Sequence, residues 1–169
     1  KMNDPRISKL ADVLLGYSIG LKKGQTLMIS GTPQASPLIK DIYAKALRLG
    51  AFPGTNVMIE GLEEVFFKNS SDEQLKYISP MRKFMLEKAD ALISIGSGYN
   101  SKSLANVDPK KLVTNSRAMA PLFKRFMQRS AKGDVRWVGC QYPTNAAAQD
   151  AVMSLSEYED FVFTACRLD

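Results

Sequence analysis

The feature that most limits the possible folds is a strand–helix–strand pattern in the first third of the chain. Residues 26–31 are a short apolar run between turn residues, and residues 54–60 are a second such run. Between them, apolar residues recur at helical spacing from Leu38 to Leu49 and stop at Gly50. Two strands joined in this way by a helix pair in parallel through a right-handed crossover. The pattern therefore predicts an α/β fold.

The alternation of strands and helices continues to the last residues. Further strands are predicted at 91–96 and 135–140, and helices at 5–15, in three pieces between 62 and 89, at 108–127, shortly after Thr144, and at 154–165. Because parallel strands are normally covered by helices, we expect a three-layer α/β fold: a mostly parallel sheet with helices on both faces. The 169 residues, 45% of them hydrophobic, suit a single domain over 1–169. The last helix runs almost to residue 169, where we expect a domain boundary.

The basic charge of the chain is spread over several elements. The formal net charge is +6, which raises the question of a nucleic-acid partner. The basic pairs at 22–23, 110–111 and 124–125 lie in different predicted elements and have no aromatic residues interleaved with them. We interpret them as solvated surface charge, and we expect no nucleic-acid partner.

Hydropathy and cysteine content also bear on the class of protein. No apolar run approaches the roughly 18 residues that a membrane-spanning helix needs. Cys140 and Cys166 are too few and too far apart for a disulfide framework. We therefore expect a reduced, cytoplasmic protein with no membrane segment.

The chain has no histidine. Histidine is the commonest metal ligand and the usual acid–base group near neutral pH. Its absence excludes Ser-His-Asp triads, Cys-His pairs and His-ligated zinc within these residues. A carboxylate, Lys or Tyr site is still possible, but no pattern marks one. The sequence thus predicts no catalytic residue and no metal ligand in this chain.

The predicted carboxyl ends of three strands carry polar or glycine-rich segments. These segments are 30–33, 96–99 and 140–144. In open α/β sheets, ligands bind at such ends. The first segment lacks the Lys-Ser/Thr of a phosphate-binding loop, and the second lacks the third glycine of a dinucleotide-binding fingerprint. Turn formation is the favoured interpretation. A stand-alone α/β module that binds a small anionic ligand there is the alternative.

Several large side chains are expected in the core. Trp137 lies inside a predicted strand and is interpreted as a core anchor, and Cys140 as a packing residue. Four methionines on predicted helices are expected in the core as well: Met81, Met85, Met119 and Met127.

Two neighbouring segments resemble a known family. Residues 136–144 read Arg-Trp-Val-Gly-Cys-Gln-Tyr-Pro-Thr, and residues 148–161 read Ala-Gln-Asp-Ala-Val-Met-Ser-Leu-Ser-Glu-Tyr-Glu-Asp-Phe. They are similar to the W-x-G-x-x-x-P-T and A-Q-x-A-x-M-S-L-x-E-Y-E-x-F stretches of the thermophilic-type metalloaminopeptidases, the aminopeptidase T and aminopeptidase S group. Shorter matches occur at 4–6, 23–24 and 71–75.

This resemblance implies an enzyme that removes N-terminal residues from peptides with divalent metal ions, which are zinc, cobalt or manganese. Proteins of the family are more than twice as long as this chain, and their metal ligands lie in the C-terminal half. No ligand is carried over, because none of those positions exists here. The resemblance implies that residues 1–169 are the N-terminal α/β domain, that a separate C-terminal domain is catalytic, and that the full-length enzyme is a homodimer.

The matching segment also gives a hypothesis about an interface. We expect Trp137, Tyr142, Pro143 and Thr144 to face the catalytic half. An exposed apolar face would favour the interpretation of this chain as one domain of a longer enzyme, because separating two domains uncovers their former interface.

Overall fold

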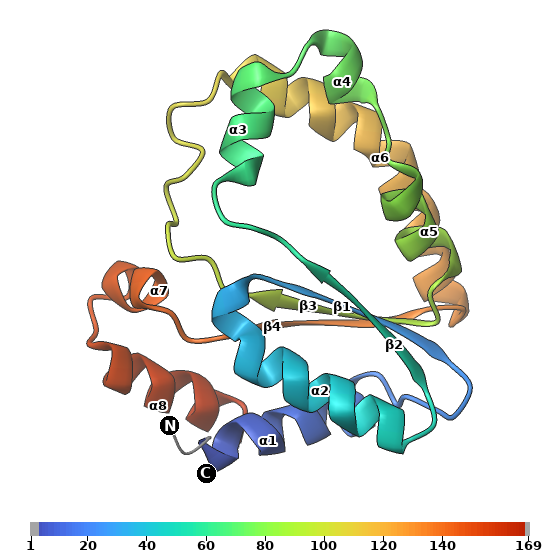
Figure 1. The fold of residues 1–169 in the computed structure, drawn as a ribbon, viewed down its shortest axis with the longest axis vertical. Helices are drawn as coiled ribbons and strands as arrows, with labels where there is room; N and C mark the ends of the chain where they lie inside the picture. The colour runs from blue at the N-terminus through green and yellow to red at the C-terminus, as the bar shows by residue number, and fades with distance from the viewer. Residues whose placement is uncertain (1–3, 168–169) are drawn as a thin grey trace.

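The computed structural model describes residues 4–167 and contains one parallel sheet (Figure 1). Within these residues the strands are β1 (Thr26–Gly31), β2 (Phe52–Val57), β3 (Ala91–Gly96) and β4 (Arg136–Gln141), and they lie in the order β2-β1-β3-β4. The helices are α1 (Pro5–Asp12), continued by the π-helical turn η1 (Val13–Ser18), the 3₁₀ turn η2 (Pro33–Ala35), α2 (Ser36–Arg48), α3 (Leu62–Asn69), α4 (Asp72–Lys76), α5 (Pro80–Lys88), α6 (Pro109–Lys132), α7 (Asn145–Asp150) and α8 (Leu155–Ala165). The predicted three-layer α/β class is confirmed.

One face of the sheet forms the main core. Leu27 and Ile29 of β1, together with Ile93 of β3, are at most 1% exposed and point to the same side. They pack under α1, α2 and α8, which lie together on that side of the sheet in Figure 1. Burying a large aliphatic side chain contributes about 1.5–3 kcal/mol, so this layer supplies most of the stability.

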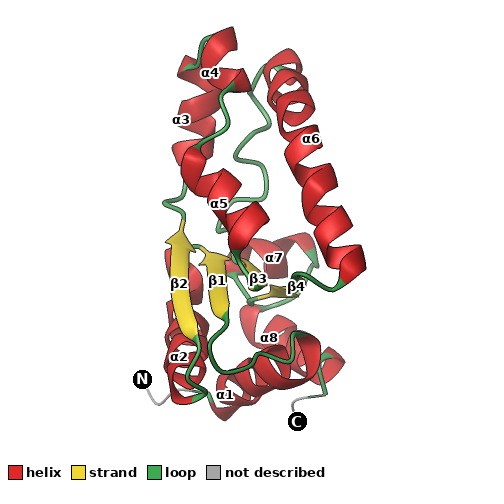
Figure 2. Cartoon of the chain, turned by 90° about the vertical axis from the view of Figure 1, so that its right-hand side faces the viewer, coloured by secondary structure: helices red, strands yellow, loops and turns green. Residues whose placement is uncertain are grey.

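The other face of the sheet is more open. The register places Met28, Leu92 and Trp137 in one row, and Ser30, Ser94 and Gly139 in the next. Helices α3 to α6 arch over this side as an arm, which Figures 1 and 2 show from two directions. Ser94 and Gly139 remain exposed under it, so small polar residues take the place of the apolar residues expected on a covered parallel sheet.

Two expectations about the core were wrong in the same region. Trp137 is 47% exposed, packs its indole against Phe126 at 6.1 Å, and donates a hydrogen bond to Ser130 Oγ at 3.1 Å. Met81 is 71% and Met127 40% exposed. Helical spacing predicts which residues share a face, but it does not show that another layer covers that face.

Strand β2 begins two residues earlier than predicted. Phe52 pairs with Thr26 at the start of β1, and the two strands stay in register to Val57. At Gly54, an added Cβ would lie 2.9 Å from Met28 Sδ. Glycine at this position leaves room for the Met28 thioether, which would have to move if residue 54 had a Cβ.

Arg6 joins the first helix to the last. Its guanidinium donates to Asp4 at 2.7 Å and to Asp160 at 2.6 Å, and it lies over the ring of Phe163 at 4.6 Å. Asp4 also caps α1 by accepting from the Arg6 backbone N–H at 2.9 Å. Hydrogen bonding to Arg6 lowers the pKa of Asp4 below its ordinary value of 3.8.

We expect Arg6→Gln to lower the free energy of unfolding by about 1 kcal/mol at neutral pH, since it removes partly exposed ion pairs and a cation–π contact. The pKa of Asp4 is lower in the folded protein than its ordinary value of 3.8. The contribution of the Asp4–Arg6 pair to the free energy of unfolding is therefore fully present above pH 3.8, and it is lost as the pH falls through the pKa of Asp4 in the folded protein. Urea unfolding of both proteins at neutral pH and at about pH 3 measures this. An equal difference at both pH values would contradict it.

Val152 follows α7 in a conformation that is unfavourable for a β-branched residue. Its φ is 57° and its side chain is 93% exposed. The left-handed region costs an L-residue about 1–2 kcal/mol. We expect Val152→Gly to raise the free energy of unfolding by roughly 1 kcal/mol in thermal or urea unfolding. The matched substitution Val113→Gly, inside α6, is expected to lower the free energy of unfolding by about as much. A destabilised Val152→Gly variant would contradict the assignment of strain.

Candidate functional site

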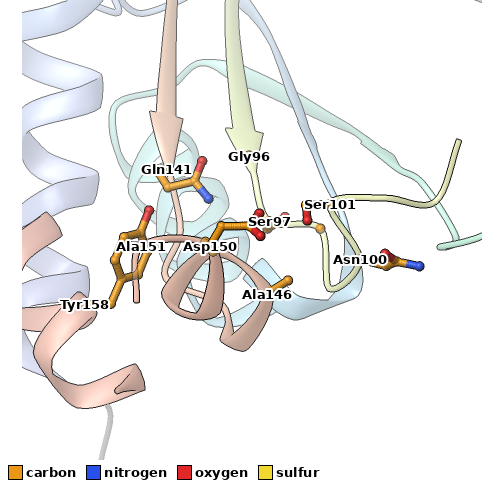
Figure 3. Close-up of a pocket in the computed structure, with 11 residues that line it drawn as sticks. Gly96, Ser97, Asn100, Ser101, Gln141, Ala146, Asp150, Ala151 and Tyr158 are labelled. Carbon is orange, nitrogen blue, oxygen red and sulfur yellow. The ribbon is translucent and has the colours of Figure 1, made fainter. Parts of the chain in front are cut away.

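A pocket of about 530 Å³ opens at the carboxyl ends of β3 and β4 (Figure 3). It is bounded by the loop after β3, the end of β4, helix α7 and the start of α8. The lining residues are Gly96, Ser97, Gly98, Asn100, Ser101, Gln141, Ala146, Ala147, Asp150, Ala151 and Tyr158.

The pocket lies one strand away from the position that the topology would suggest. The strand order reverses between β1 and β3, and ligands usually bind at that crevice. Here Thr32 and Ser97 close it: the Thr32 backbone N–H donates to Ser97 Oγ at 3.1 Å, and Thr32 Oγ1 donates to the Ser97 carbonyl at 2.8 Å. Ser97 is only 2% exposed. The open space is therefore between β3 and β4.

Thr144 fixes the wall of the pocket. Its buried hydroxyl donates to the Gly98 carbonyl at 2.9 Å and accepts from the Ala147 backbone N–H at 3.3 Å, which caps α7. One side chain thus holds helix α7 against the loop after β3. At Gly96, an added Cβ would lie 2.6 Å from Gln141 Oε1, so glycine leaves the room that the Gln141 side chain occupies.

The pocket lining carries one charge, and that charge is negative. Asp150 supplies a carboxylate, and Gln141, Ser101 and Tyr158 supply an amide and two hydroxyls. None of the eleven lining residues is Lys or Arg. This composition does not favour a small anionic ligand, which was the alternative interpretation of this edge of the sheet.

Over residues 4–167, no group of three or more Cys, Asp or Glu is placed so that it could hold a metal ion. The helices within residues 4–167 include none long and apolar enough to cross a membrane.

The four residues of the predicted interface do not form one surface. Tyr142, Pro143 and Thr144 make the turn between β4 and α7, where Pro143 and Thr144 are buried and Tyr142 packs against the main core. Burial raises the pKa of Tyr142. Trp137 lies five residues earlier on β4, on the open face of the sheet beside Phe126.

Cys140 behaves as expected for a packing residue. Its side chain contacts the main core, and burial raises the pKa of its thiol to about 12. A thiol with that pKa is a poor nucleophile near neutral pH.

The pocket lies at two of the strand ends where the alternative interpretation put a ligand, since segments 96–99 and 140–144 contribute Gly96, Ser97, Gly98 and Gln141 to its lining. Sequence reasoning missed Asp150 and Tyr158. Their spacing carries no known ligand-binding signature. Both fall in the two segments whose resemblance to a family was noted, and that was the available signal.

The comparisons with known proteins agree with that resemblance. The family model for the thermophilic metalloproteases (M29) matches residues 3–169. Aminopeptidase 2 from Geobacillus stearothermophilus is 23% identical over 180 residues, which cover 98% of this chain and 43% of that protein. The structure of wild-type AmpT from Thermus thermophilus shares the fold, with a TM-score of 0.77 and 18% identity over 95% of this chain and 42% of AmpT. The chain thus spans less than half the length of either relative. By its sequence and fold, the chain belongs to the thermophilic metalloprotease (M29) family.

Proposed function

We propose that this chain is the N-terminal α/β domain of a metal-dependent aminopeptidase that removes N-terminal residues from peptides. The family match over residues 3–169 and the similarity to aminopeptidase 2 support this assignment. The chain corresponds to about two-fifths of that relative, which leaves room for a separate catalytic domain.

The family is one of metalloproteases, but the described residues do not fit a metal centre. The chain has no histidine, and no acidic or thiol cluster in residues 4–167 is placed to bind an ion. We therefore assign no catalytic step to this chain. Zinc, cobalt or manganese would bind in the remaining part of the enzyme, where the metal would activate water for peptide hydrolysis.

The observation that carries the domain assignment is an exposed apolar surface at the base of the arm. We call it the β2–α3 patch: Met58, Ile59, Leu62, Val65 and Phe66, which are 39–66% exposed. Leu62, Val65 and Phe66 have the i, i+3, i+4 spacing that places them on one face of α3. Single exposed apolar residues are ordinary, but adjacent ones mark surfaces that another protein surface covers.

We propose that the catalytic domain of the same enzyme covers the β2–α3 patch. Trp137 stays in the proposed interface, because it is half-exposed on the open face of the sheet. Tyr142, Pro143 and Thr144 would act less directly, by holding the turn that precedes α7. Homodimerisation of the full-length enzyme and a cytoplasmic location, where Cys140 and Cys166 stay reduced, belong to the same proposal.

We expect the purified chain to bind none of zinc, cobalt or manganese stoichiometrically and to leave a leucyl anilide uncleaved, because residues 4–167 hold no group of side chains placed to bind a metal ion. Metal analysis after dialysis, and an anilide assay with each ion supplied, measure this. Stoichiometric metal together with turnover would contradict the proposal, because the chain would then hold a histidine-free catalytic site.

We expect the isolated chain to self-associate through the β2–α3 patch, and Leu62→Gln to weaken that association about tenfold. Leu47→Gln is the matched control, since Leu47 is 53% and Leu62 55% exposed but Leu47 lies on α2, away from the patch. Sedimentation equilibrium of the three proteins measures the effect. A chain that is monomeric at high concentration, or equal effects of the two variants, would count against the patch as an interface.

A further inference from the structure

The charges of this chain are segregated between two regions. Helix α6 carries seven basic residues and no Asp or Glu: Lys110, Lys111, Arg117, Lys124, Arg125, Arg129 and Lys132. Residues 141–165 carry no Lys or Arg, and their charged residues are Asp150, Glu157, Glu159 and Asp160. The pocket at the carboxyl ends of β3 and β4 has α7 and the start of α8 as walls. It therefore lies in the anionic part of a chain whose net charge is +6.

The acidic residues of that region differ in what they contact. Glu157 accepts hydrogen bonds from the N-cap Ser154, at 2.7 Å from its hydroxyl, and Asp160 pairs with Arg6 at 2.6 Å. The side chain of Asp150 has no hydrogen bond or ion pair with any other residue in 4–167. In Figure 3 its side chain extends from α7 into the pocket. It is thus an unused anionic group that faces the pocket.

The rest of the lining suits a ligand with an apolar stem and a polar backbone. Ala146, Ala147 and Ala151 provide small apolar walls, while Gln141 and Tyr158 provide hydrogen-bonding groups. Lysine and arginine side chains bury their methylene stems on such surfaces and keep the charged end at a polar group. A volume of about 530 Å³ is large enough for one such side chain and part of the adjoining backbone.

We propose that this pocket binds a lysine or arginine side chain of a peptide, with the cationic end at Asp150. The inference rests on the proposed function and extends it. If the N-terminus of the substrate occupies the metal centre in the catalytic domain, this pocket would hold a residue farther along the same peptide. It would then favour substrates with a basic residue after the cleaved position.

Binding is measured with the isolated chain and needs no catalysis. The probe is N-acetyl-Ala-Ala-Lys-Ala-amide, and its neutral match has Gln in place of Lys. We expect the Lys peptide to shift the backbone amide NMR signals of residues 96–101 and 145–151, and the Gln peptide to bind at least about fivefold more weakly. Acetylation removes the α-ammonium group, so the side chain is the only cation present.

Three variants separate a pocket from diffuse surface charge. Asp150→Asn is expected to weaken binding of the Lys peptide about fivefold. Asp134→Asn removes the same charge in the turn before β4, at the other end of the sheet, and is expected to change it less than about twofold. Ala147→Leu leaves the charge unchanged and adds bulk to the pocket wall, so it is expected to weaken binding of the Lys peptide. Thermal unfolding checks that each variant is folded. If Ala147→Leu does not fold, Asp150→Asn alone tests the proposal, because Asp150 is exposed and its substitution should not disturb the fold.

Several results would overturn the proposal: equal binding of the Lys and Gln peptides, equal effects of Asp150→Asn and Asp134→Asn, or signal shifts outside the pocket. Tighter binding of the unacetylated Gln peptide than of the acetylated Lys peptide would assign the site to an α-ammonium group instead. Any of these leaves the proposed function standing. Metal-dependent turnover by the isolated chain would overturn the proposed function and leave the binding result unchanged.

Discussion

The pairing of β1 with β3 is the constraint on which the other elements depend. Side chains join the two strands at both ends. At the amino end, Asp90 accepts hydrogen bonds from the backbone N–H and the hydroxyl of Thr26, at 2.7 and 2.8 Å. At the carboxyl end, Thr32 donates two hydrogen bonds to Ser97, and these close the crevice between the strands. With both ends fixed, the register cannot slip, and the apolar side chains of both strands stay on the covered face.

The two faces of this sheet are stabilised differently. The face under α1, α2 and α8 is a dry core, and its residues are as buried as those of any globular domain. The arm has its own small cluster around Phe67, Leu75 and Val107. Where the arm meets the sheet, Phe126 of α6 packs against Trp137 of β4, and Arg129 donates to the Ala89 carbonyl just before β3. A small cluster cannot cover every apolar side chain of four helices, so several remain at the surface. This arrangement suits a domain that is completed by another one, as we propose.

Local signals in the sequence predicted local structure well. Strands β1 and β3 begin and end where their apolar runs do. Helices α4 and α8 begin at capping boxes that Ser71 forms with Gln74 and Ser154 forms with Glu157, each three residues apart in the sequence. The failures came where a residue depends on a partner far away in the chain. Trp137 has the character of a core residue, yet its place on the fourth strand leaves it on the open face. The strand ends that border the pocket were identified from the sequence, but Asp150 and Tyr158 were not, because they meet Gln141 only after β4, α7 and α8 have folded back on one another.

The sequence by itself determined the α/β class, the order of strands and helices, the family and the lack of a histidine-based centre, because each of these follows from composition or from neighbouring residues. Only the tertiary structure decided which face of the sheet is covered, which apolar residues stay at the surface, and where a pocket opens. Those outcomes depend on the order of the strands and on the Thr32–Ser97 and Thr144–Gly98 contacts, which join residues 65 and 46 positions apart. The physical reason is that burial is a property of packed layers, and no stretch of the chain specifies what will pack against it.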